Sequence, residues 1–192
     1  MVTSEELLNL FGEGNLVKLE STAHYPKNMQ PGDVEFLAET GLPAAATGLF
    51  TVSFSKVPKA FATVSVSTDE DGAGMGLLCL GAPHPESEFR YALNLKQGFV
   101  IVLDTAKMVA EVINESLPNF VEFLYRVEQF TQFKSHVLGE REMDEQAAGT
   151  LGYAVELLTT YLGTLDSIAL ANQECWWRRI FTGDPFSLDL ET

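Results

Sequence analysis

Hydrophobic and polar residues alternate, or hydrophobic residues run on unbroken, at several places in the first half of the chain. Residues 63–67 alternate between hydroxyl and valine side chains, the period of two that is typical of a half-buried strand. Residues 75–80 form a continuous apolar run, which is typical of a central strand. Together with other segments rich in β-branched and aromatic residues, these patterns predict a series of strands. The expected strands are 49–55, 61–67, 75–80, 89–93, 98–103 and 108–113.

In the second half, apolar residues recur at intervals of three and four, which predicts helices with one buried face. The first helix is expected to begin after Ser116, a capping residue type, with Pro118 in its first turn. A second helix is expected at about 145–162, and a third from Asp166 through Ile180. In the second helix, one face carries two tyrosines and two leucines. These are Tyr153, Leu157, Leu158 and Tyr161.

Two short helices are expected before the strands. Residues 5–11 form the first. The second opens near Pro31, with Asp33 as its N-cap. Gly41 fits the left-handed position after its last turn, and Pro43 lies just beyond as a stop.

A run of strands followed by a run of helices predicts an α+β fold rather than alternating βαβ units. We expect a central, mostly antiparallel sheet flanked by short N-terminal helices and by two to three C-terminal helices. The chain has 192 residues, of which 46% are hydrophobic, enough for one domain with its own core. No internal repeat or low-complexity linker divides it. We therefore expect a single domain over 1–192.

The charge of the chain narrows the choice of partners. Twelve Lys and Arg residues stand against 27 Asp and Glu residues, so the formal net charge is −15 at pH 7. Proteins that bind nucleic acid or anionic membranes use Lys and Arg to meet phosphate groups. The charge therefore argues against direct contact with nucleic acid or membrane, and it favours a basic partner or no charged partner.

The cysteines and the N-terminal segment bear on the compartment. Cys79 and Cys175 lie in apolar surroundings and form no CxxC pair, so we expect buried thiols in a reducing compartment. The first residues are acidic and lack the basic start and apolar run of a signal peptide. No stretch approaches the roughly 20 apolar residues of a membrane span. These features predict a cytoplasmic protein.

The segment 69–76 combines three acidic residues with three glycines. A dinucleotide-binding loop would need a following helix and wider glycine spacing, and the acidic side chains would repel phosphate. A calcium loop of the EF-hand type would need a glutamate at its last position, where Leu78 stands. Both interpretations are excluded. The segment is expected to be a solvated turn between strands, and its acidity makes it a contact for a basic partner.

No pattern of side chains indicates catalysis. His24, His84 and His136 lie far apart and have no metal-ligand spacing. No nucleophile motif of the Gly-x-Ser-x-Gly type occurs. A hydrolase with two carboxylates across a cleft stays open as an alternative, but nothing singles out a pair among 27 acidic residues. We expect no catalytic residue, metal, cofactor or small-molecule substrate.

Trp176 and Trp177 precede Arg178 and Arg179, which form a small basic island. Neighbouring residues on a helix point about 100° apart, so both tryptophans are not expected to face the same core. One should anchor the helix on the sheet. The other should lie at the boundary or be exposed, where tryptophan is a frequent binding anchor. The alternative is that Trp177 lies along a neighbouring helix.

Four segments carry motifs that can be compared with known families. Residues 36–43 contain a short helix and a Gly-Leu-Pro turn, and residues 100–104 a strand ending in Asp. Residues 112–120 contain the start of a long helix, and residues 166–176 a C-terminal helix carrying Asp, Ala and Trp. Taken in order, these segments resemble the SUKH superfamily of bacterial immunity proteins and their eukaryotic relatives, and most of all its fourth immunity subfamily. The resemblance spans roughly 30–182. One departure is the absence of the glycine expected near Lys107.

The resemblance implies a SUKH-like fold and a binding protein rather than an enzyme. Immunity proteins of this superfamily neutralise domains of polymorphic toxins, many of which are nucleases or deaminases. Such toxins carry basic substrate clefts, which a strongly acidic protein can reach quickly and occlude. The resemblance therefore predicts stoichiometric neutralisation of a basic toxin domain. A non-catalytic adaptor, as among the eukaryotic members, and a mimic of DNA that blocks nucleic-acid proteins are the alternatives.

The expected partner contacts are chosen for charge and exposure. They are Asp69, Glu70, Asp71, Glu86, Glu88 and Trp177. A second group of residues matches the family motifs and is expected to set turns, caps and core. These residues are Gly41, Pro43, Asn114, Ser116 and Trp176.

Overall fold

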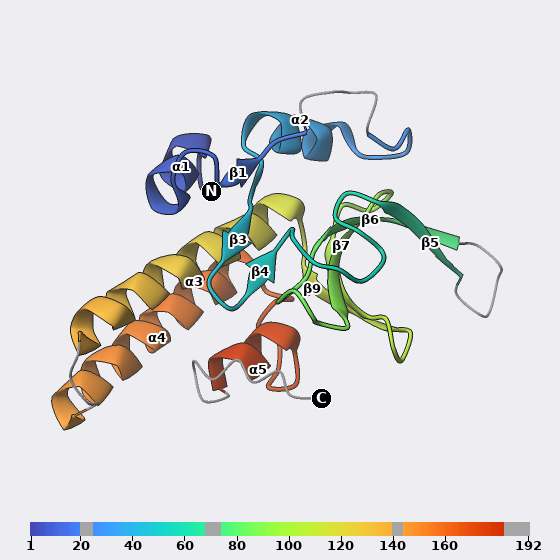
Figure 1. Ribbon diagram of the computed structural model, residues 1–192. Helices are drawn as coiled ribbons and strands as arrows, with labels where there is room; N and C mark the ends of the chain where they lie inside the picture. Colours follow the sequence, from blue (N-terminus) through green and yellow to red (C-terminus); the bar gives the residue numbers. More distant parts are fainter. Residues whose placement is uncertain (20–24, 68–73, 140–143, 183–192) are drawn as a thin grey trace.

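A computed structural model describes residues 1–19, 25–67, 74–139 and 144–182 of the chain. Its centre is a five-stranded antiparallel sheet in which each strand pairs with its neighbours in sequence, in the order β5-β6-β7-β8-β9 (Figure 1). The strands are β5 (Thr63–Ser67), β6 (Gly74–Gly81), β7 (Phe89–Asn94), β8 (Val100–Asp104) and β9 (Val109–Asn114). The predicted α+β class with an antiparallel sheet is confirmed.

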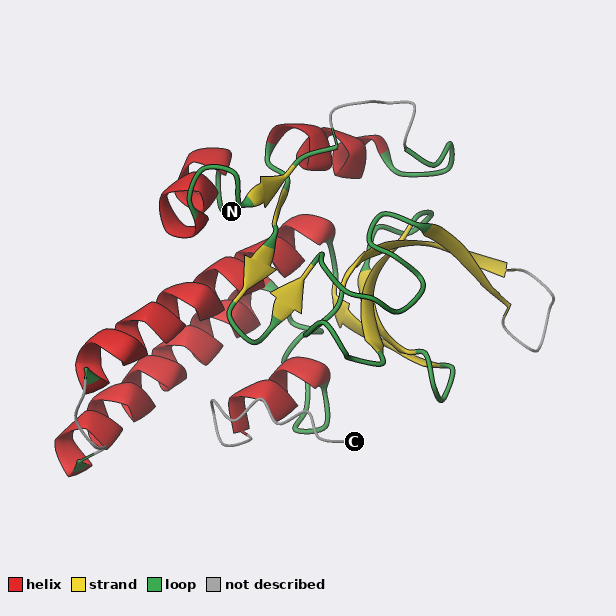
Figure 2. Cartoon of the chain, viewed as in Figure 1, coloured by secondary structure: helices red, strands yellow, loops and turns green. Residues whose placement is uncertain are grey.

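Short elements precede the sheet, and two long helices and a short one follow it (Figure 2). The N-terminal helices are α1 (Ser4–Phe11) and α2 (Pro31–Glu39), and the later ones are α3 (Leu117–Leu138), α4 (Glu145–Leu165) and α5 (Trp176–Thr182). Two small two-stranded sheets complete the fold. In these, β1 (Leu16–Val17) pairs with β2 (Leu42–Pro43), and β3 (Ala45–Ala46) pairs with β4 (Phe50–Thr51).

Helices α3 and α4 form an antiparallel pair that extends beyond the sheet (Figure 2). The hydroxyl of Tyr161, near the end of α4, donates to the carboxylate of Glu122, near the start of α3, at 3.1 Å. The amide of Asn119 likewise donates to the carbonyl of Leu165 at 3.4 Å. Glu122 is fully buried and also accepts from Arg126 at 2.8 Å, so its charge is compensated inside the pair.

An aromatic cluster joins the sheet to the helices. Tyr91 on β7 lies 5.1 Å from Phe120 on α3 and 5.9 Å from Trp176 on α5, measured between ring centroids. All three rings are buried, and the Tyr91 hydroxyl donates to the carbonyl of Leu49 at 3.1 Å. Helix α5 therefore docks against both the sheet and α3.

A buried carboxylate fixes the connections around α5. Asp166 accepts from the side chains of Asn114 at 3.0 Å and Asn119 at 3.2 Å, and from the backbone amides of Glu115 at 2.8 Å and Ala169 at 3.2 Å. The indole of Trp177 then donates to Asn114 at 3.0 Å. The ends of β9 and α4 are thereby joined to α5 through polar groups that would be costly to leave unpaired.

Two of the motif residues end or begin helices. Gly41 follows the last turn of α2 with φ +80, and a Cβ there would lie 2.7 Å from the carbonyl oxygen of Val17. Only glycine fits both the left-handed backbone and this close approach. Ser116 is the N-cap of α3, and its hydroxyl accepts from the amide of Asn119 at 3.2 Å. Pro43 lies buried in β2, opposite Leu16.

Three expectations about local structure are wrong. Asp33 is not the N-cap of α2: Gln30 holds that position, because Pro31 occupies the first turn, and Asp33 is buried inside the helix. Within 49–55, only Phe50 and Thr51 form a strand. No helix runs on from Asp166, because its carboxylate closes a turn while bonding to the connection before α3, and α5 begins only at Trp176.

Candidate functional site

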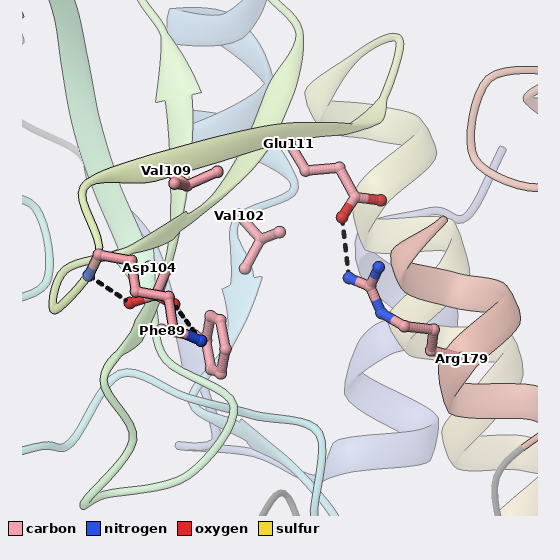
Figure 3. A pocket seen from close by; sticks show the side chains of 7 residues that line it. Phe89, Val102, Asp104, Val109, Glu111 and Arg179 are labelled. Atoms are coloured by element: carbon pink, nitrogen blue, oxygen red, sulfur yellow. Dashed lines mark hydrogen bonds and ion pairs between the residues drawn. The ribbon is translucent and has the colours of Figure 1, made fainter. Parts of the chain in front are cut away.

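Two adjoining hollows lie where the β8–β9 hairpin meets α5 and the segment before β7; we call them together the double hollow. The larger has a volume of about 360 Å³ and an apolar lining from Phe89, Val102 and Val109 (Figure 3). The smaller has a volume of about 210 Å³. The two share Phe89, Asp104 and Lys107.

Asp104 holds the hairpin turn between the two hollows. Its carboxylate accepts from the backbone amides of Ala106 and Lys107, at 3.0 Å each. These bonds, that from Lys107 most of all, hold the pKa of Asp104 below its ordinary value. The ammonium of Lys107 lies 3.6 Å away and is 75% exposed, so it is a loosely held counter-charge.

The same turn accounts for the missing glycine near Lys107. Met108 takes the left-handed backbone, with φ 55, and exposes its side chain. An L-residue pays about 1–2 kcal/mol for this conformation. The hairpin therefore closes without a glycine, at a cost in stability.

Glu111 on β9 connects the larger hollow to α5. One of its carboxylate oxygens accepts from the backbone amide of Trp176 at 2.6 Å. The other accepts from the guanidinium of Arg179 at 2.8 Å (Figure 3). Arg179 also lies over the Trp176 ring, 5.7 Å from its centroid. A carboxylate and a guanidinium thus form one wall of the hollow, half-exposed to solvent.

Two predicted contact residues line the smaller hollow. Glu86 is exposed and makes no side-chain hydrogen bond or ion pair within the described part of the chain. Glu88 pairs with Lys56, and this hydrogen bond is the main reason why the pKa of Glu88 lies below its ordinary value. Thr105 also donates to the Glu88 carboxylate, at 3.4 Å. Exposed pairs of this kind are weak and exchange readily with other cations.

Trp177 does not lie at the surface, so its expected exposure is wrong. Its side chain is fully buried, 5.0 Å from the ring of Phe123 on α3, while Trp176 is 3% exposed and lies 5.2 Å from Phe89. Because α5 sits in the corner between the sheet and α3, two directions about 100° apart both point into the interior. Trp177 is therefore unavailable as a surface anchor, as the alternative interpretation had it.

The other predicted contacts, Asp69, Glu70 and Asp71, lie outside the described residues. The structure instead places Asp104 in the smaller hollow with Glu86 and Glu88, and Asp104 and Glu111 together in the larger hollow. Sequence reasoning had not proposed Asp104 or Glu111 as a contact. The available signal was that Asp104 ends β8 and that Glu111 follows across the hairpin, where the register pairs it with Val102.

Reactive groups do not converge on the double hollow. Among the described residues, no group of three or more His, Cys, Asp or Glu side chains is placed to hold a metal ion. Cys79 is buried in a different part of the sheet, where desolvation raises the pKa of its thiol to about 11. Its nucleophilic thiolate form is therefore suppressed at neutral pH. The arrangement of carboxylates around an apolar floor suits the binding of a cationic side chain.

No helix in the described ranges is long and apolar enough to cross a membrane. In comparison with known proteins, the model of a family described as SUKH-4 immunity protein matches residues 2–183. No curated protein and no solved structure matches the chain significantly.

Proposed function

The chain belongs to the SUKH-4 immunity protein family, and we propose that it neutralises its cognate toxin by binding a basic domain of that toxin one to one. The family match over residues 2–183 carries this proposal. The toxin domain is of the class that acts on nucleic acid, a nuclease or a deaminase, whose substrate cleft is basic. The immunity protein covers this cleft and keeps nucleic acid out.

The charge of the chain supports a basic partner. A formal charge of −15 creates a field that speeds the approach of a cationic domain and that salt weakens. Long-range charge sets the rate of association, whereas tightness depends on a few well-seated side chains. A specific surface is therefore needed in addition to the net charge.

We place this surface at the double hollow. The aliphatic stem of a lysine or arginine from the toxin lies on Phe89, Val102 and Val109, and its cationic head reaches Asp104 or Glu111. Lys107, which is highly exposed and loosely paired, moves aside. Glu86 and Glu88 form the entrance from the smaller hollow. The three acidic residues Asp69, Glu70 and Asp71 remain proposed contacts.

The test is calorimetric titration with the toxin domain encoded beside the gene, at low and at high salt. We expect one-to-one binding that weakens with salt, and we expect Glu86→Lys together with Glu88→Lys to weaken it by at least about tenfold. The matched control is Glu13→Lys with Glu35→Lys, two exposed glutamates that change the net charge by the same amount.

If the two double variants lose the same amount of affinity for the toxin domain, binding depends only on net charge. The double hollow would then not be the binding surface. Binding that salt does not affect would contradict the basic partner. Failure of this toxin domain to bind, together with capture of a host regulatory protein, would favour the adaptor alternative.

A further inference from the structure

Helix α4 has a solvent-facing surface with almost no charge, although the chain as a whole is strongly acidic. Over its 21 residues, its only charged side chains are Glu145 and Glu156. Three large apolar side chains on it are exposed: Tyr153 by 64%, Leu157 by 53% and Tyr161 by 40%. The sequence pattern places these on one face. In the structure this face is turned mainly to solvent, and Tyr161, at the edge of the face next to α3, keeps the hydroxyl bond to Glu122.

The exposed side chains form a stripe along the helix, and the residue types in this stripe are arranged symmetrically about Leu157. Tyrosines stand four positions before and after Leu157, and threonines, Thr150 and Thr164, seven positions before and after it. At about 100° per residue, all five project within about 40° of one line along the helix. All five are exposed. We call this set the α4 stripe.

A stripe with this symmetry can pack against a second copy of itself that is rotated by 180° about an axis perpendicular to the helix. In a two-fold interface, residue i of one copy contacts residue j of the other, and j contacts i. With the axis at Leu157, the two Leu157 side chains meet, and each Tyr153 meets the Tyr161 of the second copy. The two threonines pair in the same way.

We propose that the α4 stripe is the contact between two copies of this chain, arranged as an antiparallel helix pair with Leu157 at the two-fold axis. This inference is independent of the toxin proposal. It concerns a different element, and it invokes a second copy rather than a cationic partner.

Charge favours a second copy over a basic partner at this stripe. Two chains of charge −15 repel each other, so they approach most easily where carboxylates are absent. Glu156 flanks the stripe on the side away from α3. The two-fold axis is perpendicular to the plane of the two antiparallel helices, so Glu156 stays on that same side in both copies, and the two Glu156 side chains lie together at one edge of the contact, outside the stripe. A basic toxin would find no carboxylate within the stripe itself.

The size of the stripe indicates a weak dimer. From Thr150 to Thr164 it extends about 21 Å at 1.5 Å per residue. Phe133 lies seven positions after Arg126, hence on the same face of α3, and its exposure of 41% widens the apolar surface. A helix-pair contact of this length lies at the small end of stable interfaces, so we expect dissociation in the micromolar range.

The first experiment is sedimentation velocity on the full chain from about 1 to about 200 µM, at low and at high salt. We expect the mass to rise with concentration from 21.1 kDa towards twice that value. High salt should strengthen the association, because it screens the repulsion between the two acidic copies. A mass that stays at 21.1 kDa over the whole range would overturn the proposal.

Leu157→Glu tests the stripe, since it places two like charges face to face at the axis. We expect the dimer to weaken by at least about tenfold. Ala148→Glu is the matched control: it adds the same charge to an exposed position on the opposite side of α4 and should leave the dimer unchanged. Mixing Leu157→Glu with Leu157→Lys should restore association as a mixed dimer. A dimer that Leu157→Glu leaves intact would place the interface elsewhere.

Cross-linking tests the position of the axis. Antiparallel helices packed about 8–10 Å apart bring facing Cα atoms to about 4–6 Å, within the range of a disulfide. Under mild oxidation, Leu157→Cys should link to itself, whereas Tyr153→Cys should link only when mixed with Tyr161→Cys. The native Cys79 and Cys175 are buried and should not react. Self-linking of Tyr153→Cys alone would refute the axis. A monomer whose Leu157→Glu variant loses toxin binding would assign the stripe to the toxin instead.

Discussion

Replacing Asp166 with asparagine should measure how much the buried network contributes to stability. One carboxylate oxygen of Asp166 accepts from Asn114, Glu115 and Asn119, at 3.0, 2.8 and 3.2 Å, and the other from the amide of Ala169 at 3.2 Å. Asparagine keeps one oxygen acceptor and turns the other into a donor. It can therefore serve either the three donors or Ala169, but not both.

The expected cost follows from these bonds. Hydrogen bonds to a charged group contribute about 1.5–3 kcal/mol each, neutral ones about 1 kcal/mol, and an unmet buried donor costs about 1–3 kcal/mol. Three weakened bonds and one lost bond are offset in part by no longer burying a charge. We expect Asp166→Asn to lower the free energy of unfolding by about 2 kcal/mol, and Asp166→Ala by about 4 kcal/mol.

Urea unfolding followed by tryptophan fluorescence is a suitable assay, because both tryptophans of the chain are buried beside this network. Asp144→Asn is the matched control. Asp144 caps α4 by accepting from Ala147 at 2.7 Å, and asparagine caps equally well, so the change should stay within about 0.5 kcal/mol. If Asp166→Asn costs no more than this control, the hydrogen bonds of Asp166 do not hold α5 in place.

Two further predictions concern single residues. Met108→Gly should raise the free energy of unfolding by about 0.5–1 kcal/mol, because it relieves the left-handed backbone at the hairpin turn, measured by thermal unfolding; a loss of stability would contradict this. Burial raises the pKa of Asp33 to about 6, and one of its oxygens has no hydrogen-bond partner among the described residues. Between about pH 4 and 6 the folded state thus binds a proton that the unfolded state releases, so stability should fall as the pH rises through this window. Urea unfolding across the window should show a smaller fall for Asp33→Asn, and an unchanged fall would exclude Asp33 as its source.

Local signals in the sequence predicted much of the fold. Antiparallel strands joined in sequence order need only short-range pairing, and the capping residue Ser116 and the left-handed Gly41 act on their own backbone. The prediction that a helix begins at Asp166 failed for the opposite reason. The carboxylate of Asp166 bonds to groups about fifty positions away along the chain, which no local pattern reveals.

The candidate site was less predictable because it depends on register and on packing between layers. Asp104 and Glu111 reach the same hollow only because the β8–β9 register pairs Asp104 with Val109 and Val102 with Glu111. The expected exposure of Trp177 assumed a helix lying on one surface. In the structure α5 lies in a corner, where two neighbouring directions are both buried.

The double hollow and the α4 stripe use opposite physical devices on one acidic chain. Carboxylates and a field of −15 attract a cationic partner to the hollow, so salt should weaken that complex. The stripe lacks charge and must overcome repulsion between like chains, so salt should strengthen the pairing of copies. Ionic strength therefore moves the two equilibria in opposite directions. Because the sites lie on different elements, β8–β9 and α4, a variant in either one should shift only its own equilibrium.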